Sequence, residues 1–161
     1  IQYMAKRRIG ALISIEQGNS LEEFINTGIP IHSDISNQLI TNIFIPNTPL
    51  HDGAVIIRDY KIAAAACYLP LSENKMIPKE LGTRHRAAIG LSEVSDAITI
   101  IISEETGKVS VAIREKLHRE LSSSELVAVL SEHLVVEDQE DKEPTIVRWV
   151  RDFFKGGRSN G

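Results

Sequence analysis

The sequence predicts a single α/β domain with a mixed central β-sheet and helices on both sides of the sheet. The chain has 161 residues, which is the length of one compact domain. Its composition, 42% hydrophobic and 25% charged, is that of an ordinary globular protein. Strand patterns and helix patterns are interspersed along the chain, with hairpins as well as longer crossovers, and this order favours a mixed sheet between two layers of helices.

The N-terminal part of the sequence begins with a helical pattern followed by a strand pattern. Residues 1–9 form a helical lead-in, and residues 10–17, apolar at first and then alternating, predict a strand. Ser20 and Glu23 form a capping box, which predicts a short helix up to residue 26. Apolar side chains at helical spacing predict a second helix over residues 36–44.

The middle of the sequence predicts a hairpin, a long loop and a helix. The apolar runs 54–58 and 61–68 flank a two-residue turn, as the strands of a hairpin do. A loop with two prolines follows, up to Gly82. Thr83 is suited to capping a helix N-terminus and predicts a helix over residues 83–94.

The C-terminal part predicts two more strands and two more helices. Residues 97–103 are almost wholly apolar and β-branched, as in a strand buried on both faces, and residues 109–114 alternate. Helical patterns cover residues 122–135 and, after an acidic connection at 137–143, residues 144–154. We therefore place one main domain, large enough to be a catalytic domain, at residues 10–155 and a loose tail at residues 156–161.

Charge and cysteine content exclude several classes of protein. With 18 basic and 22 acidic residues the net charge is -4, which argues against a nucleic-acid polymer as partner. The single cysteine, Cys67, cannot form an internal disulfide and suits a reducing compartment; we expect it to be a small core residue. The sequence contains no phosphate-loop, dinucleotide-binding or zinc-hydrolase motif and no paired cysteines.

The first residues suggest a missing upstream segment. The sequence starts at Ile1 without an initiator Met, which is the pattern left when a preceding segment has been removed. Lys6-Arg7-Arg8 has two interpretations: the cytoplasmic flank of a membrane span, or an ordinary solvated helix end. No apolar stretch in the sequence reaches the length of a membrane span, about 20 residues.

Three polar clusters interrupt the apolar scaffold. The first, His51-Asp52-Gly53-Ala54, offers a carboxylate for a divalent cation or a hydroxyl proton, beside two residues small enough for a ligand to approach the backbone. A plain Asp-Gly turn would look the same. The second cluster is Gly82-Thr83-Arg84-His85-Arg86.

The arginines of the second cluster point to an anion site. Arg84 and Arg86 lie at the positive end of a helix dipole, where cations are unfavourable, so their presence there is a mismatch typical of functional sites. Together with free peptide N–H groups they suit a phosphate, although both could instead pair with surface carboxylates.

The third cluster, Ser103-Glu104-Glu105, could supply a metal ligand or be a solvated turn. Together the clusters fit a nucleoside triphosphate with Mg²⁺ or Mn²⁺.

The first two clusters together resemble the signature of a known family. Asp52-Gly53-Ala54 followed by Arg84-His85-Arg86 is similar to the paired motifs of the diadenylate cyclase (DAC) domain. The similarity runs from about residue 10 to residue 134, and the two ends of the chain resemble the membrane-linked CdaA type of Gram-positive bacteria without its N-terminal membrane helices. The resemblance implies a DAC-domain fold in a cytoplasmic domain, with the full-length protein anchored in the cell membrane.

The resemblance also implies a reaction and roles for individual residues. Two ATP would condense into cyclic di-AMP across a face-to-face homodimer. The resemblance also allows for regulatory protein partners. Asp52, Arg84, His85 and Arg86 would be catalytic, and Asp52, Glu105 and His51 would hold the divalent metal ion. Substrate-binding residues would be Gly53, Ala54, Tyr68, Leu69, Thr83, Arg84 and Ser103. The alternative is a non-catalytic module that binds ATP or senses a cyclic dinucleotide.

Overall fold

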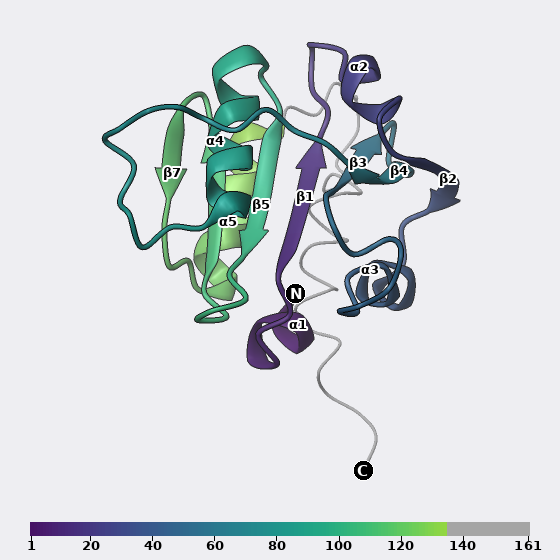
Figure 1. The fold of residues 1–161 in the computed structure, drawn as a ribbon, viewed down its shortest axis with the longest axis horizontal. Coiled ribbons are helices and arrows are strands. Elements are labelled where there is room, and N and C mark those ends of the chain that lie inside the picture. The colour runs from purple at the N-terminus through teal and green to yellow at the C-terminus, as the bar shows by residue number, and fades with distance from the viewer. Residues whose placement is uncertain (135–161) are drawn as a thin grey trace.

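The computed structural model describes residues 1–134 and forms one seven-stranded mixed sheet (Figure 1). The strand order is β2-β4-β3-β1-β5-β6-β7. β1 and β3 are parallel, and the other neighbouring pairs are antiparallel. The predicted acidic connection, the helix over 144–154 and the tail lie outside the described residues.

The strands have the following bounds: β1 Ala11–Ile15, β2 Ile29–Asp34, β3 Ala54–Arg58, β4 Lys61–Cys67, β5 Ile98–Ile102, β6 Val109–Ile113 and β7 Lys116–His118. The central strands β1, β5 and β6 are buried along their whole length. The alternating apolar and polar residues predicted for β1 and β6 would normally leave one face of the strand exposed to solvent. Here both faces are buried, because helices cover both sides of the sheet centre.

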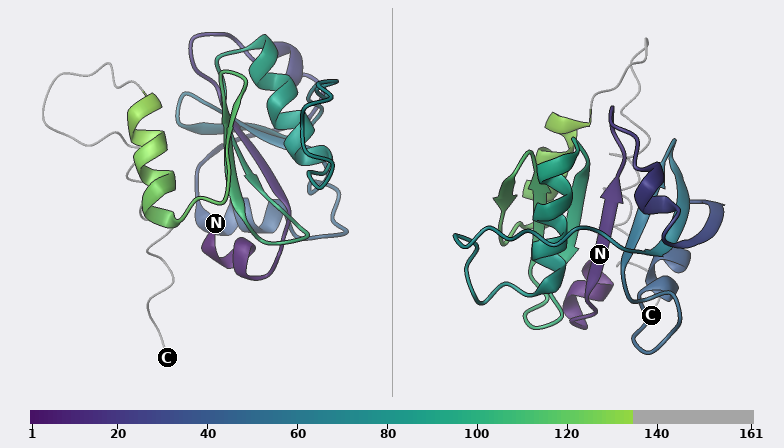
Figure 2. Two further views of the ribbon diagram at one scale, coloured as in Figure 1. Left: turned by 90° about the vertical axis from the view of Figure 1, so that its left-hand side faces the viewer. Right: turned by 45° about the horizontal axis from the view of Figure 1, so that its top comes forward.

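The helices have the following bounds: α1 Gln2–Lys6, α2 Glu22–Ile25, α3 Asn37–Ile43, α4 Thr83–Val94 and α5 Ser123–His133. α1, α3 and α5 contribute Met4, Ile40 and Leu126 to the larger core on one face of the sheet. α4 packs on the other face through Ala88 and Leu91. Figure 2 shows α4 and α5 on opposite sides of the sheet, which confirms the predicted fold class. Within residues 1–134, no helix has the length and hydrophobicity needed to cross a bilayer.

Two strands were not predicted, β2 and β7. β2 is an edge strand with largely exposed residues; it contains Pro30 and a left-handed residue, His32, where its pairing with β4 shifts register. β7 has three residues and follows a turn formed by Arg114 and Glu115, both with positive φ. Neither segment carries a regular strand pattern, because edge position and shortness remove it.

The two predicted helix caps are wrong, and the structure shows two caps that were not predicted. Ser36 caps α3 by accepting a hydrogen bond from the Leu39 N–H, and Ser122 forms a capping box with Glu125 at α5. Ser20 caps nothing in the predicted way, because α2 begins two residues later with Leu21 at its N-cap. Thr83 is the first residue of α4, and Gly82 is its N-cap.

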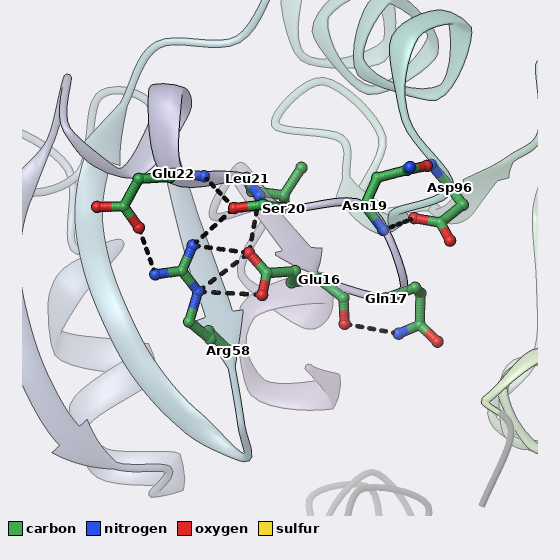
Figure 3. A network of polar contacts seen from close by, with 8 residues as sticks. All are labelled: Glu16, Gln17, Asn19, Ser20, Leu21, Glu22, Arg58 and Asp96. Atoms are coloured by element: carbon green, nitrogen blue, oxygen red, sulfur yellow. Dashed lines mark hydrogen bonds and ion pairs between the residues drawn. The ribbon is translucent and has the colours of Figure 1, made fainter.

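An ion-pair network explains the late start of α2 (Figure 3). Arg58 at the end of β3 donates to Glu16 after β1, at 2.9–3.0 Å, and to Glu22 of α2 at 2.6 Å. The Glu16 carboxylate also accepts from the Leu21 N–H at 2.7 Å. Burial alone would raise the pKa of Glu16, but the hydrogen bonds from Arg58 and Leu21 outweigh it and lower that pKa. Through Arg58 and the Leu21 N–H, Glu16 thus fixes the start of α2 against the sheet.

Candidate functional site

The register of the sheet brings distant parts of the sequence to one edge. β1 and β3 run parallel with Ile13 opposite Val55, so Gly10 and Gly53 precede neighbouring strands at the same edge. β5 runs the other way and ends there, because Ala11 lies opposite Ile102. β4 also ends there, since Ala54 pairs with Cys67. α4 begins over this edge, with the guanidinium of Arg84 against Gly10.

The predicted Asp-Gly-Ala cluster forms the tight entry to β3. Asp52 is exposed, whereas Ala54 is fully buried in the core under α4. Gly53 has φ +116°, and a Cβ there would lie 2.8 Å from the backbone of Ala66 and Cys67. A glycine is therefore required by the crossing of the β3 entry over the end of β4, in addition to any ligand.

His51 has one ring nitrogen fixed and the other available. Its Nδ1 lies 2.7 Å from the carbonyl oxygen of Thr48, which can only accept, so Nδ1 carries the proton in the neutral ring. Nε2 is then a lone-pair donor, the state in which a histidine binds a metal ion. Asp52 and His51 thus offer oxygen and nitrogen ligands from adjacent positions.

The end of β4 presents an aromatic side chain at the same edge. Ala66 adopts a left-handed conformation, φ 53°, where the β3–β4 register is irregular. Tyr68 follows with 72% of its surface exposed, and its N–H donates to the Thr27 hydroxyl at 2.8 Å. Leu69 is half-buried against the core beneath α4. Cys67 is buried, as predicted, and burial raises the pKa of its thiol to about 11.

The first turn of α4 combines free backbone donors with a guanidinium. Among residues 1–134, no side chain caps this N-terminus. Thr83 is exposed, and Arg84, whose side chain is 20% exposed, pairs with Glu104 at 3.1 Å. Arg86 points elsewhere: its Nη1 lies 3.5 Å from the carbonyl oxygen of Ser72, in the loop that follows β4. The structure thus separates the two arginines of the motif.

His85 is the buried member of this turn, only 6% exposed. Burial, with a smaller contribution from the charge of Arg119, lowers its pKa, so the ring is neutral at pH 7. It therefore supports the cleft as a packed side chain and does not add a second cation beside Arg84.

A cleft of about 310 Å³ lies between α4 and the turn after β5. Five residues of the prediction line it: Thr83, Arg84, His85, Ser103 and Glu105. The Ser103 hydroxyl accepts from the N–H groups of Glu105 and Thr106, both at 3.3 Å, and so shapes the acidic turn. The other predicted site residues do not line this cleft: His51, Asp52, Gly53, Ala54, Tyr68, Leu69 and Arg86.

Three further cleft residues were not predicted: Lys79, Glu80 and Leu81. They belong to the proline-containing loop, where the sequence has no periodic pattern, so only the fold could place them. Gly10, which contacts Arg84, was likewise missed because it precedes a strand and resembles any strand-initiating glycine.

Comparison with known families decides what this arrangement is. Residues 1–117 match the family DAC, described as "DisA bacterial checkpoint controller nucleotide-binding". The chain belongs to the DAC family. Its two signature clusters, around Asp52 and Arg84, meet at the sheet edge described above.

Two curated relatives are similar to most of the chain. It is 63% identical over 130 residues to "Cyclic di-AMP synthase CdaA" of Bacillus subtilis, covering 81% of this chain and 48% of the relative. It is 55% identical over 159 residues to "Diadenylate cyclase" of Listeria monocytogenes, covering 98% and 56%. The chain thus spans about half the length of these curated relatives.

Two solved structures share the fold. A double mutant of DacA from Staphylococcus aureus superimposes with a TM-score of 0.80 at 59% identity, covering 82% of this chain and 88% of that chain. A hypothetical membrane spanning protein from Bacillus cereus superimposes with a TM-score of 0.72 at 45% identity, covering 75% and 59%. The DAC-domain fold predicted from the sequence is therefore confirmed.

Proposed function

We propose that this chain is the catalytic domain of a diadenylate cyclase, which condenses two ATP into cyclic di-AMP and releases two pyrophosphates. The observation that carries the proposal is the convergence of the Asp52 and Arg84 clusters at one sheet edge, beside a cleft with free helix N–H groups. The names of the relatives, "Cyclic di-AMP synthase CdaA" and "Diadenylate cyclase", agree with it. The 161-residue chain would act as a homodimer in which each subunit holds one ATP.

Phosphate binding is assigned to the first turn of α4. The unpaired N–H groups and the helix dipole favour an anion, and the Arg84 guanidinium lies at the wall of the cleft. Thr83 and Ser103 add hydroxyls from opposite walls. Charge placed there would stabilise the negative charge that develops during phosphoryl transfer.

Nucleoside binding is assigned to the end of β4. The exposed Tyr68 ring offers a face for stacking on adenine, and the half-buried Leu69 offers its backbone to the base edge. Gly53 has no side chain at the β3 entry, so the ribose could approach its backbone, and the buried Ala54 next to it adds only a methyl group. The family resemblance thus assigns substrate-binding roles to residues that do not line the cleft.

The donor chemistry of the site fits a divalent cation. Asp52 and Glu105 supply exposed carboxylates, and His51 supplies Nε2. The described part of the chain holds no cluster of three or more His, Cys, Asp or Glu placed to bind one ion. Mg²⁺ is commonly held by one or two carboxylates together with substrate phosphates, so ATP would complete the coordination. The ion would neutralise charge on the phosphates and lower the pKa of the attacking hydroxyl.

The reaction consists of two identical displacements at phosphorus. The 3′-oxygen of one nucleotide forms a bond to the α-phosphorus of the other, and the bond from that phosphorus to the bridging oxygen breaks. The pyrophosphate departs with the bonding electrons, and the hydroxyl proton passes to the Asp52 carboxylate, which is exposed and near the β3 entry. Because each site needs the other nucleotide, turnover requires two chains facing each other.

Turnover separates an enzyme from a nucleotide-binding module. Incubation of the chain with ATP and Mn²⁺ should yield cyclic di-AMP, detected by mass spectrometry, and the rate per subunit should rise with protein concentration. Asp52→Asn should abolish turnover while the melting temperature stays near that of the wild type, since the residue is exposed and the change is nearly isosteric. ATP binding without any product, at all protein concentrations, would instead identify a binding module.

Localisation at the membrane is a separate part of the proposal. The similarity to the Bacillus cereus protein, which is described as membrane spanning, supports a full-length protein anchored in the cell membrane with this domain on its cytoplasmic side. The basic residues Lys6-Arg7-Arg8 would then lie next to the bilayer. Fractionation of cells expressing the full-length protein, compared with the 161-residue chain alone, tests this.

A further inference from the structure

The position of Arg84 depends on a residue outside every motif. If Gly10 carried a Cβ, that atom would lie 2.6 Å from Cζ, 2.7 Å from Nη1 and 3.0 Å from Nε of Arg84. These distances are too short for a real side chain, so the guanidinium occupies the space that only a glycine leaves free. Gly10 is buried and lies between α1 and β1.

The guanidinium is also held by the acidic turn. Arg84 pairs with Glu104 at 3.1 Å, and the turn that carries Glu104 is closed by the Gly107 N–H donating to the Ser103 carbonyl at 2.8 Å. Gly107, with φ +73°, packs against the carbonyl oxygen of Ala5. The segment from Ala5 to Gly10 therefore contacts the acidic turn through Ala5 and Arg84 through Gly10.

We propose that Gly10 is a positioning residue for the anion site: it holds the Arg84 guanidinium against the cleft, and the segment Ala5–Gly10 couples the N-terminal end of the domain to that site. This inference rests on the proposed function, because Arg84 is assigned there to the phosphates of ATP. Gly10 touches no substrate and acts through Arg84.

The substitution Gly10→Ala isolates this role because of what would have to move. At Gly28, Gly53, Gly90 and Gly107 an added Cβ meets backbone atoms, so a change there disturbs the fold. At Gly10 the three nearest atoms all belong to the far end of a flexible side chain, and Arg84 can swing away at little cost to stability. We therefore expect the Gly10→Ala variant to fold normally and to lose the geometry of the anion site.

A matched control exists at the opposite edge of the sheet. A Cβ at Gly18 would lie 2.9 Å from Oδ2 of Asp96, which is again the end of a flexible side chain. Gly18 follows β1 at its other end and is not part of the site. Gly18→Ala therefore reproduces the chemical change without touching Arg84.

Titration with ATP in the presence of Ca²⁺, which binds phosphates and slows turnover, measures the effect. Gly10→Ala should weaken binding about 10-fold or more, the loss expected when one charge-assisted contact is misplaced. Gly18→Ala should bind as the wild type does, and both variants should keep the melting temperature. In an Arg84→Ala background Gly10→Ala should have no further effect, because its only route is already removed.

Two outcomes would overturn the inference. Wild-type affinity in Gly10→Ala would show that Arg84 needs no such support, and an equal loss in both Arg84 backgrounds would show a route other than Arg84. A chain that binds no ATP at all would refute the proposed function alone. The side-chain NMR signal of Arg84 Nε still decides in that case: it should shift in Gly10→Ala and not in Gly18→Ala, and an unshifted signal contradicts the inference.

Discussion

Gly90 in the middle of α4 provides a test in which helix propensity and packing predict opposite signs. Replacing glycine by alanine inside a helix normally stabilises a protein by about 1 kcal/mol. Here the missing side chain faces the loop after β4: a Cβ would overlap the carbonyl oxygen of Pro70 and lie 2.8 Å from the Ser72 nitrogen. These are backbone atoms, which cannot rotate out of the way.

The loop that would have to move is fixed to α4 by several bonds. The Ser72 N–H donates to the Arg86 carbonyl at 3.0 Å, and its hydroxyl donates to Glu93 at 2.5 Å. Overpacking costs about 1–3 kcal/mol, and losing a hydrogen bond to a charged group costs about 1.5–3 kcal/mol. After subtracting the gain in propensity, we expect Gly90→Ala to lower the free energy of unfolding by about 2–4 kcal/mol.

Urea denaturation measures this change as a lower midpoint with an unaltered slope. Gly82→Ala is the control, because a Cβ there meets no atom within 4 Å and only the N-cap preference is lost, about 1 kcal/mol or less. Thermal unfolding should agree, with a drop of about 5–15 °C for a chain of this size. If Gly90→Ala is as stable as the wild type or more stable, the close contact between α4 and the loop is wrong.

Three further predictions concern stability. Thr99→Val should cost about 1–3 kcal/mol by leaving the buried Ser14 hydroxyl without its 2.9 Å partner, whereas the double variant with Ser14→Ala should recover most of that loss in urea denaturation. Burial lowers the pKa of His85, so stability is fully present above its unfolded value near 6.5 and is lost as pH falls through the folded pKa; denaturation at pH 8 and pH 5 should show a decline that His85→Gln reduces. Arg58→Met should lower stability at pH 7 by about 1–2 kcal/mol, because the 15% exposed Glu16 loses its partner, and the difference from wild type should shrink as Glu16 is protonated in acid.

Comparison of two hairpins shows what the sequence can and cannot predict about the fold. Both turns have two residues with positive φ, Asp59-Tyr60 and Arg114-Glu115. The first was predicted because long apolar runs flank it, and aspartate tolerates the left-handed region. The second was missed because neither Arg nor Glu favours that conformation and the strand after it has three residues. Tertiary pairing with β6 imposes it.

The candidate site shows the same division. The types of residue that bind phosphate and metal ions could be read from the clusters around Asp52 and Arg84, because their chemistry is local. The divergence of Arg84 and Arg86 could not, since it depends on where Glu104 and the loop after β4 come to lie. Gly10 could not be found either, because its importance is a distance to a side chain 74 positions further along the chain.

The ion pair between Arg84 and Glu104 explains how one arginine can be both held in place and available to a ligand. Arg84 is mostly buried, but the Glu104 side chain is 60% exposed, so the pair contributes little to stability. A phosphate entering the cleft can replace that carboxylate at small cost and form stronger, charge-assisted bonds with the same guanidinium. Because Gly10 leaves the space that the Arg84 guanidinium occupies, the guanidinium need not move when its partner changes. Preorganisation of this kind lowers the entropy lost on binding, which is why a glycine outside the motifs matters to the site.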